Sequence, residues 1–523
     1  MSSRHAPRPS QRYVRSLLGL TTAAFAAATI ETPLPPQRIA RTSWGATAFA
    51  TTTPFPSPRA SLPALFPPSR PSPRRSLSSD KSSRPIRPLR PGGVESPGEG
   101  GVLLESSLSD DDGGAPSPAS SRARSPPPAD GGGESDDPAY WLGLAIELRR
   151  AGDLPASYGA ILRASNLLPD SPEISYQRGM VLADMGRTKE AADAYRGLMA
   201  PAARSGGGGA LSPPPSPVAA VALASILLDG MGDRGEGEVL GPLRRVCASG
   251  PGPASLLCGL AHASSADAPR RDEAAKYLEE AVRFDPRDVD AVLHLMICKH
   301  GEGDRAAADG LRKRLPDAVA QSWDYVLENC PDMVKRRPEV LRYFTRDMID
   351  LAADAAGGSA LENGLVLEFG VFYGKTLRMI VDRFPTTDAH GFDTFGGLPE
   401  DWRGTKKGAY STAGVLPDVT GNVSLHQGLF SDSLPKFLEK QQGRPVRFVN
   451  VDCDLYSSTK DVLDALGDLV ISGTVLVFDE YVMNPRWQED EYRAFQEAVE
   501  EKGWNYEYLG ISLVTGQAVV RIL

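Results

Sequence analysis

Leu365-Val-Leu-Glu-Phe-Gly-Val-Phe-Tyr-Gly374 begins as a buried strand, at residues 365–369, and continues into a turn bounded by two glycines. A helix is expected to follow at residues 375–384. Further strands are expected at residues 389–393, 423–426, 446–452 and 475–479, and a terminal hairpin at residues 506–512 and 517–523. Because strands alternate with helices, the pattern predicts an α/β domain at residues 335–523, a doubly wound parallel sheet covered on both faces.

Four of the expected strands end on an acidic residue. These residues are Glu368, Asp393, Asp452 and Asp479. Ligands of open α/β sheets bind outside the carboxyl ends of the strands, so these carboxylates are candidate site residues. The first turn is not a Rossmann fingerprint, because three residues separate Gly370 from Gly374. It is not a P-loop either, because Phe369 stands where the first glycine is needed.

The first turn and the second strand together follow the pattern of S-adenosylmethionine-binding folds. Glu368 precedes the glycines Gly370 and Gly374, and the second strand ends on Asp393. In such folds the glycines let the backbone approach the methionine portion, and the second-strand acid accepts hydrogen bonds from ribose hydroxyls. We therefore expect S-adenosylmethionine as the cofactor, bound by these four residues.

A metal site is expected where the fourth and fifth strands end. Asp452 ends the fourth strand, and the pair Asp479 and Glu480 ends the fifth, which should be its neighbour. Clustered carboxylates repel one another unless they are protonated or bridged by a cation, and Mg²⁺ suits oxygen ligands. Bound Mg²⁺ would acidify a substrate hydroxyl and orient it for methyl transfer. The alternative is that these acids cap the helices that follow.

Two further features are candidates for the chemistry. Asp454 is the candidate general base, since a carboxylate beside a metal-bound hydroxyl can remove its proton. Its alternative role is to cap a helix that starts near Ser457. Residues 402–420 form a long irregular segment with glycines and lysines. They are expected to cover the cofactor as a lid, and a solvated insertion is the alternative.

These segments together resemble the macrocin O-methyltransferase (TylF/MycF-like) family. The resemblance covers about 160 residues and rests on the motifs EFGVFYGKT at 368–376, GFDTFGGLP at 391–399, QGLFSDSLP at 427–435, VDCDLYSST at 451–459 and FDEY at 478–481. Five motifs in this order make the resemblance specific.

The resemblance implies a class I methyltransferase fold, S-adenosylmethionine as cofactor, and Mg²⁺-assisted methylation of sugar hydroxyls. Residues at the family's cofactor positions are Glu368, Gly370, Gly374, Asp393 and Gln427, and those at its metal positions are Asp452, Asp479 and Glu480. This chain departs from the family pattern at Cys453, where glycine is frequent, and at Glu480, where aspartate is frequent.

Residues 138–330 have helical periodicity and an internal repeat. Gly152 and Gly186 lie 34 residues apart, the period of a tetratricopeptide repeat. Residues 272–286 follow the same pattern, and their proline ends the second helix of the unit. We expect an all-α array of tetratricopeptide-like repeats, which would bind a protein partner. The alternative is a helical spacer packed against its neighbour.

Residues 1–137 differ in composition from the rest of the chain. Up to Ser79 they contain ten arginines, no lysine and one acid, Glu31. This composition is typical of plastid and mitochondrial transit peptides, whereas the apolar run at residues 16–30 favours a secretory signal as the alternative. That run is too short and too polar to predict a membrane span. Residues 80–137 are rich in Gly, Ser, Pro and acids, which predicts a disordered spacer.

The overall composition limits the possible functions. A net charge of −9 argues against nucleic-acid binding, which normally needs a basic surface. The five cysteines contain no CxxC pair, so neither a zinc site nor a disulfide framework is expected. We predict a methyltransferase of a small hydroxylated acceptor, such as a sugar. The alternative is an interaction scaffold whose methyltransferase-like domain has lost turnover.

Overall fold

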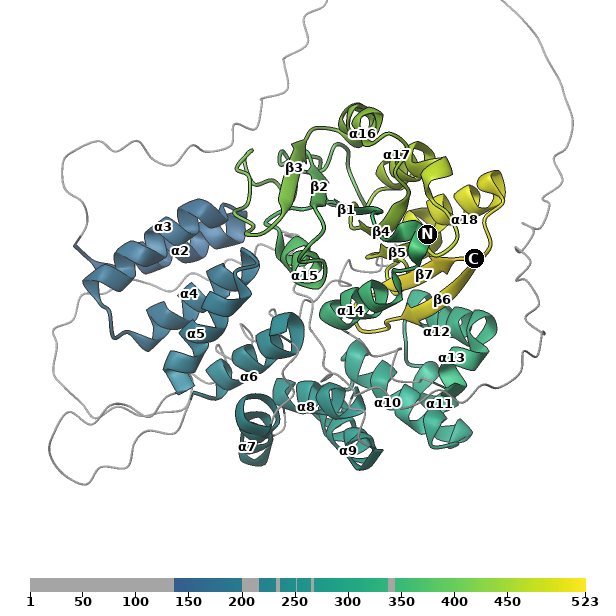
Figure 1. The fold of residues 1–523 in the computed structure, drawn as a ribbon. Coiled ribbons are helices and arrows are strands. Elements are labelled where there is room, and N and C mark those ends of the chain that lie inside the picture. Colours follow the sequence, from purple (N-terminus) through teal and green to yellow (C-terminus); the bar gives the residue numbers. More distant parts are fainter. Residues whose placement is uncertain (1–135, 200–215, 232–235, 251, 265–267, 337–343) are drawn as a thin grey trace, which may run out of the picture. The chain divides into compact units, whose positions relative to one another are not determined.

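A computed structural model describes residues 136–199, 216–231, 236–250, 252–264, 268–336 and 344–523 (Figure 1). The predictions for residues 1–137 therefore fall almost entirely outside the described residues. Residues 137–523 belong to one compact unit. In the described part, no helix is long and apolar enough to cross a membrane.

Among the described residues from Pro138 to Arg336, all regular elements are helices. They are α2 (Pro138–Ala151), α3 (Leu154–Leu167), α4 (Pro172–Asp184), α5 (Thr188–Met199), α6 (Pro217–Ile226), the π-helical turns Leu227–Met231 and Glu236–Leu240, α7 (Gly241–Ser249), α8 (Pro253–Ala263), α9 (Ala268–Phe284), α10 (Val289–Gly301), α11 (Arg305–Arg312), α12 (Asp317–Asn329) and α13 (Pro331–Arg336). The predicted repeat pattern is confirmed as helix pairs. Gly152 is the C-cap of α2, and Gly186 follows the C-cap of α4. Their φ angles are positive, 83° for Gly152 and 66° for Gly186, which is a backbone conformation that favours glycine.

Small residues allow the paired helices of this region to pack closely. A Cβ at Gly179 of α4 would lie 2.5 Å from the ring of Tyr195 in α5. Ser157 of α3 is fully buried, and its hydroxyl donates to the carbonyl of Ala145 in α2 at 2.7 Å. The small residues that predict the repeat are therefore needed at the helix contacts.

The remaining chain forms a seven-stranded sheet with helices between the strands. The elements are α14 (Thr345–Ala355), β1 (Leu365–Phe369), α15 (Lys375–Arg383), β2 (Ala389–Asp393), β3 (Val423–Gln427), α16 (Phe430–Leu438), β4 (Val446–Val451), α17 (Tyr456–Leu466), β5 (Val475–Phe478), α18 (Glu491–Lys502), β6 (Tyr506–Ile511) and β7 (Ala518–Ile522). The strand order is β3-β2-β1-β4-β5-β7-β6, with β7 antiparallel to both neighbours and the other pairs parallel. This confirms the predicted class I methyltransferase-like sheet and its terminal hairpin.

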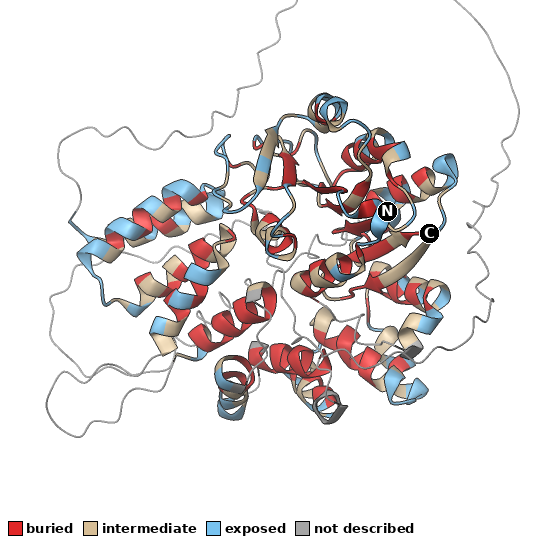
Figure 2. Ribbon diagram, in the orientation of Figure 1, coloured by how far each residue is buried: buried red, intermediate tan, exposed pale blue. Residues whose placement is uncertain are grey.

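Both faces of the sheet are covered, as predicted. On β1, Leu365, Leu367 and Phe369 pack into the core that includes α16, α17 and α18, whereas Val366 packs into the core of α14 and α15. This alternation follows from the pleat of a strand, in which successive side chains point to opposite faces. Figure 2 shows the consequence, because the central strands are buried along their length whereas β3 at the edge is not.

The helical region and the sheet share a core. Val319, Trp323 and Val326 of α12 belong to the same cluster of buried residues as β1, β4 and β5. The hydroxyls of Tyr325 in α12 and Tyr508 in β6 are 2.6 Å apart. The helices are therefore an integral layer of the fold.

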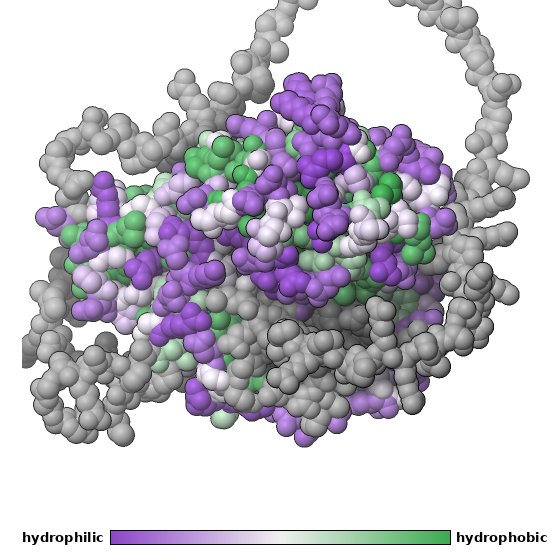
Figure 3. Space-filling view, viewed as in Figure 1, coloured by the Kyte–Doolittle hydropathy of each residue, from purple (hydrophilic) through white to green (hydrophobic). Residues whose placement is uncertain are grey.

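On the face shown in Figure 3, hydrophobic patches of the described residues are small and interspersed with hydrophilic ones.

Candidate active site

A cavity of ≈ 310 Å³ lies where the strands β1, β2 and β4 end. Of the residues predicted from the sequence, it is lined by Gly370, Asp393, Asp452 and Asp454. The remaining predicted residues, Glu368, Gly374, Gln427, Asp479 and Glu480, are not part of its lining. The cavity therefore occupies the edge of the sheet at which ligands of open α/β folds bind.

The two glycines of the first turn are required for different reasons. Gly370 has φ 90°, and a Cβ there would lie 1.7 Å from the carbonyl oxygen of Asp452. Glycine therefore allows the turn after β1 to cross the end of β4. Gly374 has φ 74° and begins α15, and a Cβ there would lie 2.8 Å from Val419 of the 402–420 segment.

Asp393 holds this turn in place. Its Oδ2 accepts hydrogen bonds from the backbone N–H groups of Val371 at 2.9 Å and Phe372 at 2.7 Å. Its Oδ1 accepts a third from Phe395 at 2.6 Å. A carboxylate offers about four lone-pair sites, so Asp393 keeps capacity for a ligand hydroxyl. Gln427 pairs with Asp393 in the register of the sheet, but its side chain is exposed and donates to the carbonyl of Thr394 at 3.4 Å.

Glu368 is buried beneath the turn. Its Oε1 accepts a hydrogen bond from Asn450 at 3.1 Å, and Oε2 has no hydrogen-bond partner among the described residues. Burial raises the pKa of Glu368 well above its ordinary value, and the nearby charge of Asp452 raises it further. A positive charge bound nearby would stabilise the ionised carboxylate and so lower the pKa of Glu368.

The turn after β4 places two acids at the cavity. Asp452 and Asp454 both line it, and Asp454 is buried with φ 66°, an unusual backbone conformation for a non-glycine residue. The predicted alternative, that Asp454 caps the next helix, stays a prediction, although Leu455 itself occupies the N-cap position of α17. Strained backbone of this kind is concentrated at functional sites.

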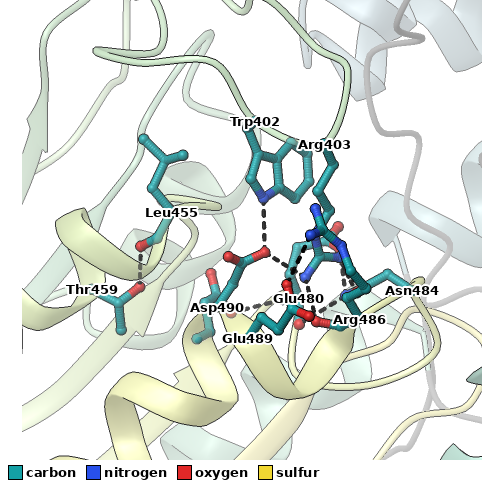
Figure 4. A network of polar contacts seen from close by, with 10 residues as sticks. Trp402, Arg403, Leu455, Thr459, Glu480, Asn484, Arg486, Glu489 and Asp490 are labelled. Carbon is teal, nitrogen blue, oxygen red and sulfur yellow. Dashed lines mark hydrogen bonds and ion pairs between the residues drawn. The ribbon is translucent and has the colours of Figure 1, made fainter. Parts of the chain in front are cut away.

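The predicted three-carboxylate metal site does not form. Asp479 follows β5 beside Asp452, as predicted, but its Oδ1 accepts a hydrogen bond from Gln517 Nε2 at 2.6 Å. The Glu480 side chain contacts the loop after β5 instead, where its Oε2 accepts a hydrogen bond from Asn484 Nδ2 at 3.1 Å (Figure 4). Across the described ranges, no group of three or more His, Cys, Asp or Glu residues could hold a metal ion.

The 402–420 segment forms part of the cavity wall. Its residue Tyr410 lines the cavity. Near its start, Trp402 Nε1 donates to Asp490 Oδ2 at 3.0 Å, and Arg403 pairs with Asp490 and bonds to Asn484 (Figure 4). The segment is therefore fixed to the chain that joins β5 to α18, and a purely solvated insertion does not describe it.

The helical repeats also line this cavity, which the sequence did not predict. Ala183, Asp184 and Gly186, at the turn between α4 and α5, contribute to its wall. Gly186 packs directly on α15, since a Cβ there would lie 2.8 Å from Lys375 Cβ. Lys375 in turn forms an ion pair with the buried Asp229 of the π-helical turn after α6. The Gly152–Gly186 repeat identified this turn but gave no sign of what it contacts.

The charge of the cavity lining is strongly negative. Six carboxylates and one ammonium group line it, namely Asp184, Asp393, Glu400, Asp452, Asp454, Asp461 and Lys375. Two of these groups are already paired with another charge, Asp184 with Arg149 and Lys375 with Asp229. The excess of acidic over basic groups in the lining favours a cationic ligand, such as one that carries a sulfonium and an ammonium group.

Among the comparisons with known proteins, a family model covers most of the residues of the sheet domain that form this site. Residues 367–481 match the family model described as a methyltransferase domain. No curated protein matches the chain. Among solved structures, CalS11, titled a calicheamicin methyltransferase, is 21% identical with a TM-score of 0.29, over 39% of this chain and 91% of that chain.

Two other solved structures are also similar to this chain. YrrB, titled a TPR protein with an unusual peptide-binding site, is 17% identical with a TM-score of 0.26, over 34% of this chain and 84% of its own. Human N-acetylserotonin methyltransferase, in complex with SAM, is 13% identical with a TM-score of 0.24, over 75% of this chain and 99% of its own. The family match is the one that bears on function, and it runs from β1 to the residues after β5, so that this region of the chain is similar to a methyltransferase domain.

Proposed function

We propose that the protein is an S-adenosylmethionine-dependent O-methyltransferase that acts on a small hydroxylated molecule such as a sugar. The observation that carries the proposal is the acid-lined cavity, which lies at the strand ends within the region similar to a methyltransferase domain. The finer resemblance to the macrocin O-methyltransferase family supports the choice of a hydroxyl acceptor.

The residues at the cavity fit this cofactor. The turn from Gly370 to Tyr373 would contact its methionine portion, and Asp393 has lone pairs left for its ribose hydroxyls. Glu368 does not line the cavity but directly precedes the turn that does, and a cation bound nearby would stabilise its ionised carboxylate. When bound, the cofactor supplies an electrophilic methyl group.

Asp454 is the residue placed to act as general base. It lines the cavity beside Asp452, and the rigid turn that gives it φ 66° fixes its direction. In this role its carboxylate accepts the proton of the acceptor hydroxyl as the oxygen attacks the methyl group, a contribution of about 10²–10⁴ in rate. Tyr410 of the 402–420 segment forms part of the wall of the same cavity.

Magnesium assistance is a prediction of the sequence that the residue arrangement does not support. Only Asp452 of its three proposed ligands lines the cavity, so we derive no step through a metal ion. Turnover measured with Mg²⁺ and with EDTA decides the point. Loss of turnover in EDTA, with cofactor binding retained, would restore the metal to the mechanism, and equal turnover would remove it.

The test of the proposed function is transfer of labelled methyl groups from S-adenosylmethionine to a panel of neutral sugars and phenols. Asp454→Asn should lower turnover about 100-fold or more while cofactor affinity stays within about threefold of wild type. Asp468→Asn is the matched control, because it makes the same change at an exposed residue that does not line the cavity. Cofactor binding without transfer to any acceptor would favour the alternative, an inactive scaffold.

Two further proposals rest on the sequence alone. The composition of residues 1–79 supports delivery to a plastid or mitochondrion, with the secretory pathway as the alternative. A fluorescent protein fused behind residues 1–137 would distinguish these destinations.

The helical repeats support the proposal that this region binds a protein partner. Affinity capture with the full chain, compared with full-chain variants that carry substitutions within Asp137–Met199 and remain folded, would test it.

A further inference from the structure

A second and larger cavity adjoins the first. Its volume is ≈ 600 Å³, and it lies between the α4–α5 turn, α15 and residues 415–420. Gly186, Tyr373 and Lys375 line both cavities, so these three residues form the partition between them. The two cavities therefore adjoin one another between the helical repeats and the sheet domain.

Tyr373 marks the partition as a polar binding point. The side chain is 6% exposed, and its hydroxyl has no hydrogen-bond partner among the described residues. Burial, followed by the charge of Asp153, raises the pKa of Tyr373 to about 12, so the hydroxyl keeps its proton at neutral pH. An unpaired buried hydroxyl costs free energy, which a ligand with a hydrogen-bonding group would recover.

The charged groups of the second cavity are largely neutralised within the protein. Arg187 donates two hydrogen bonds of 2.7 Å to Glu190, and Lys375 is paired with Asp229. Arg378 donates to the backbone carbonyls of Tyr373 at 2.8 Å and Asp418 at 2.6 Å. The remaining cation, Lys189, is exposed at the rim. An anionic ligand would thus find little uncompensated positive charge inside.

Much of the rest of the wall is apolar, although Thr188, Asp382, Asp418 and Thr420 also line it. It contains Pro155, Met185, Met379, Leu416 and Pro417. Apolar surface with a few fixed polar groups is the usual composition of a small-molecule site.

Resting on the methyltransferase function proposed above, we propose that the second cavity binds the distal part of the acceptor. The acceptor is then an extended molecule whose reacting hydroxyl lies in the first cavity. Its continuation, uncharged and bearing hydroxyl groups, passes Gly186 and receives a hydrogen bond from Tyr373. The helical repeats thereby help to select the acceptor.

Cofactor analogues that carry a tail can test this without knowledge of the acceptor. The parent probe is S-adenosylhomocysteine with its sulfur replaced by an N-methyl amine, and three others carry an octyl, 8-hydroxyoctyl or 7-carboxyheptyl group in place of the methyl. Calorimetric titration of the full chain should give hydroxyoctyl binding at least as tight as that of the parent. The carboxylate tail should bind at least tenfold more weakly than the hydroxyl tail.

Three variants link these affinities to the second cavity. Tyr373→Phe should lower the preference for hydroxyoctyl over octyl about fivefold, the effect of one neutral hydrogen bond. Met185→Trp, which fills the cavity, should weaken both neutral tails at least tenfold relative to the parent. Leu168→Trp makes a similar change at an exposed residue of the repeats and should leave every ratio unchanged. Melting curves confirm that each variant is folded.

The outcomes separate the two proposals. If the parent probe and S-adenosylmethionine both fail to bind, the methyltransferase function itself is refuted. If the parent binds but the neutral tails lose tenfold or more in affinity, the second cavity does not take the acceptor. Tight tail binding that Met185→Trp leaves unchanged would also overturn the inference, since the tail would then run elsewhere.

Discussion

Gly370 shows how a single residue connects the fold to the site. Its N–H donates to the carbonyl of Phe392 at 2.9 Å, and its missing side chain makes room for the carbonyl of Asp452. The turn after β1 can therefore lie against β4 and still face the cavity. A glycine that the sequence assigns to cofactor contact is thus required first for the packing of two strand ends.

Substitution of this glycine should destabilise the protein. In Gly370→Ala a methyl group would overlap the Asp452 carbonyl at a positive φ, so we expect a loss of at least ~2 kcal/mol in the free energy of unfolding. Denaturant unfolding measures the loss. Gly357→Ala is the control, because open space surrounds its Cβ position and its φ is not positive. Equal stability of the two variants would show that the turn does not lie where we describe it.

The position of this turn at the strand ends could be predicted from the sequence because its signals are local, whereas the binding roles of its residues stay predictions. Glu368, Gly370 and Asp393 follow from strand periodicity, turn chemistry and the rule that ligands bind at strand ends. The roles of Asp479 and Glu480 could not be predicted in the same way. Asp479 contacts Gln517 of the terminal hairpin, and Glu480 contacts Asn484 of the loop after β5. No spacing in the sequence predicts either contact.

At the level of the elements, the 402–420 segment is held in place by contacts to one distant residue, Asp490. Asp490 accepts from Trp402 and pairs with Arg403, and the same segment supplies Tyr410 to the cavity wall. The sequence predicted an irregular segment over the cofactor because of its glycines and lysines. Its anchor was not predictable, since Asp490 lies about 90 residues further along the chain.

Removal of this anchor should weaken cofactor binding. Asp490→Ala deletes both contacts, and the loss of a hydrogen bond to a charged group, worth about 1.5–3 kcal/mol, predicts S-adenosylmethionine affinity lowered about tenfold. Isothermal titration measures the change. Lys406→Ala, in the same segment with an 81% exposed side chain, should bind as the wild type does. An unchanged affinity in Asp490→Ala would mean that the segment takes no part in binding.

At the scale of the whole molecule, the helical repeats and the sheet domain join through the ion pair of Asp229 and Lys375. Burial raises the pKa of Asp229 from 3.8 to about 6, and Lys375 offsets part of that effect. The periodicity of the sequence predicted both regions separately. Their contact depends on matching surfaces of α4, α6 and α15, which no local pattern encodes.

This pair predicts a specific dependence of stability on pH. Because the folded pKa of Asp229 is raised, the protonated group favours the folded state, and that stability is lost as pH rises from about 4 through about 6. The wild type should therefore lose up to ~3 kcal/mol relative to Asp229→Asn over this range. Unfolding of both proteins at pH 4, 5, 6 and 7 measures the difference. A constant difference would show that Asp229 is not buried at this contact.

Titration of the full chain with S-adenosylmethionine tests the central claim most directly. We expect one binding site per chain. Asp393→Ala should lower the affinity for S-adenosylmethionine about tenfold or more, because it removes both the ribose contact and the hydrogen bonds that hold the first turn. Asp388→Ala, just before β2 and away from the cavity, should bind as the wild type does. Absence of binding by the folded wild type, or equal affinity of the Asp393→Ala variant, would contradict it.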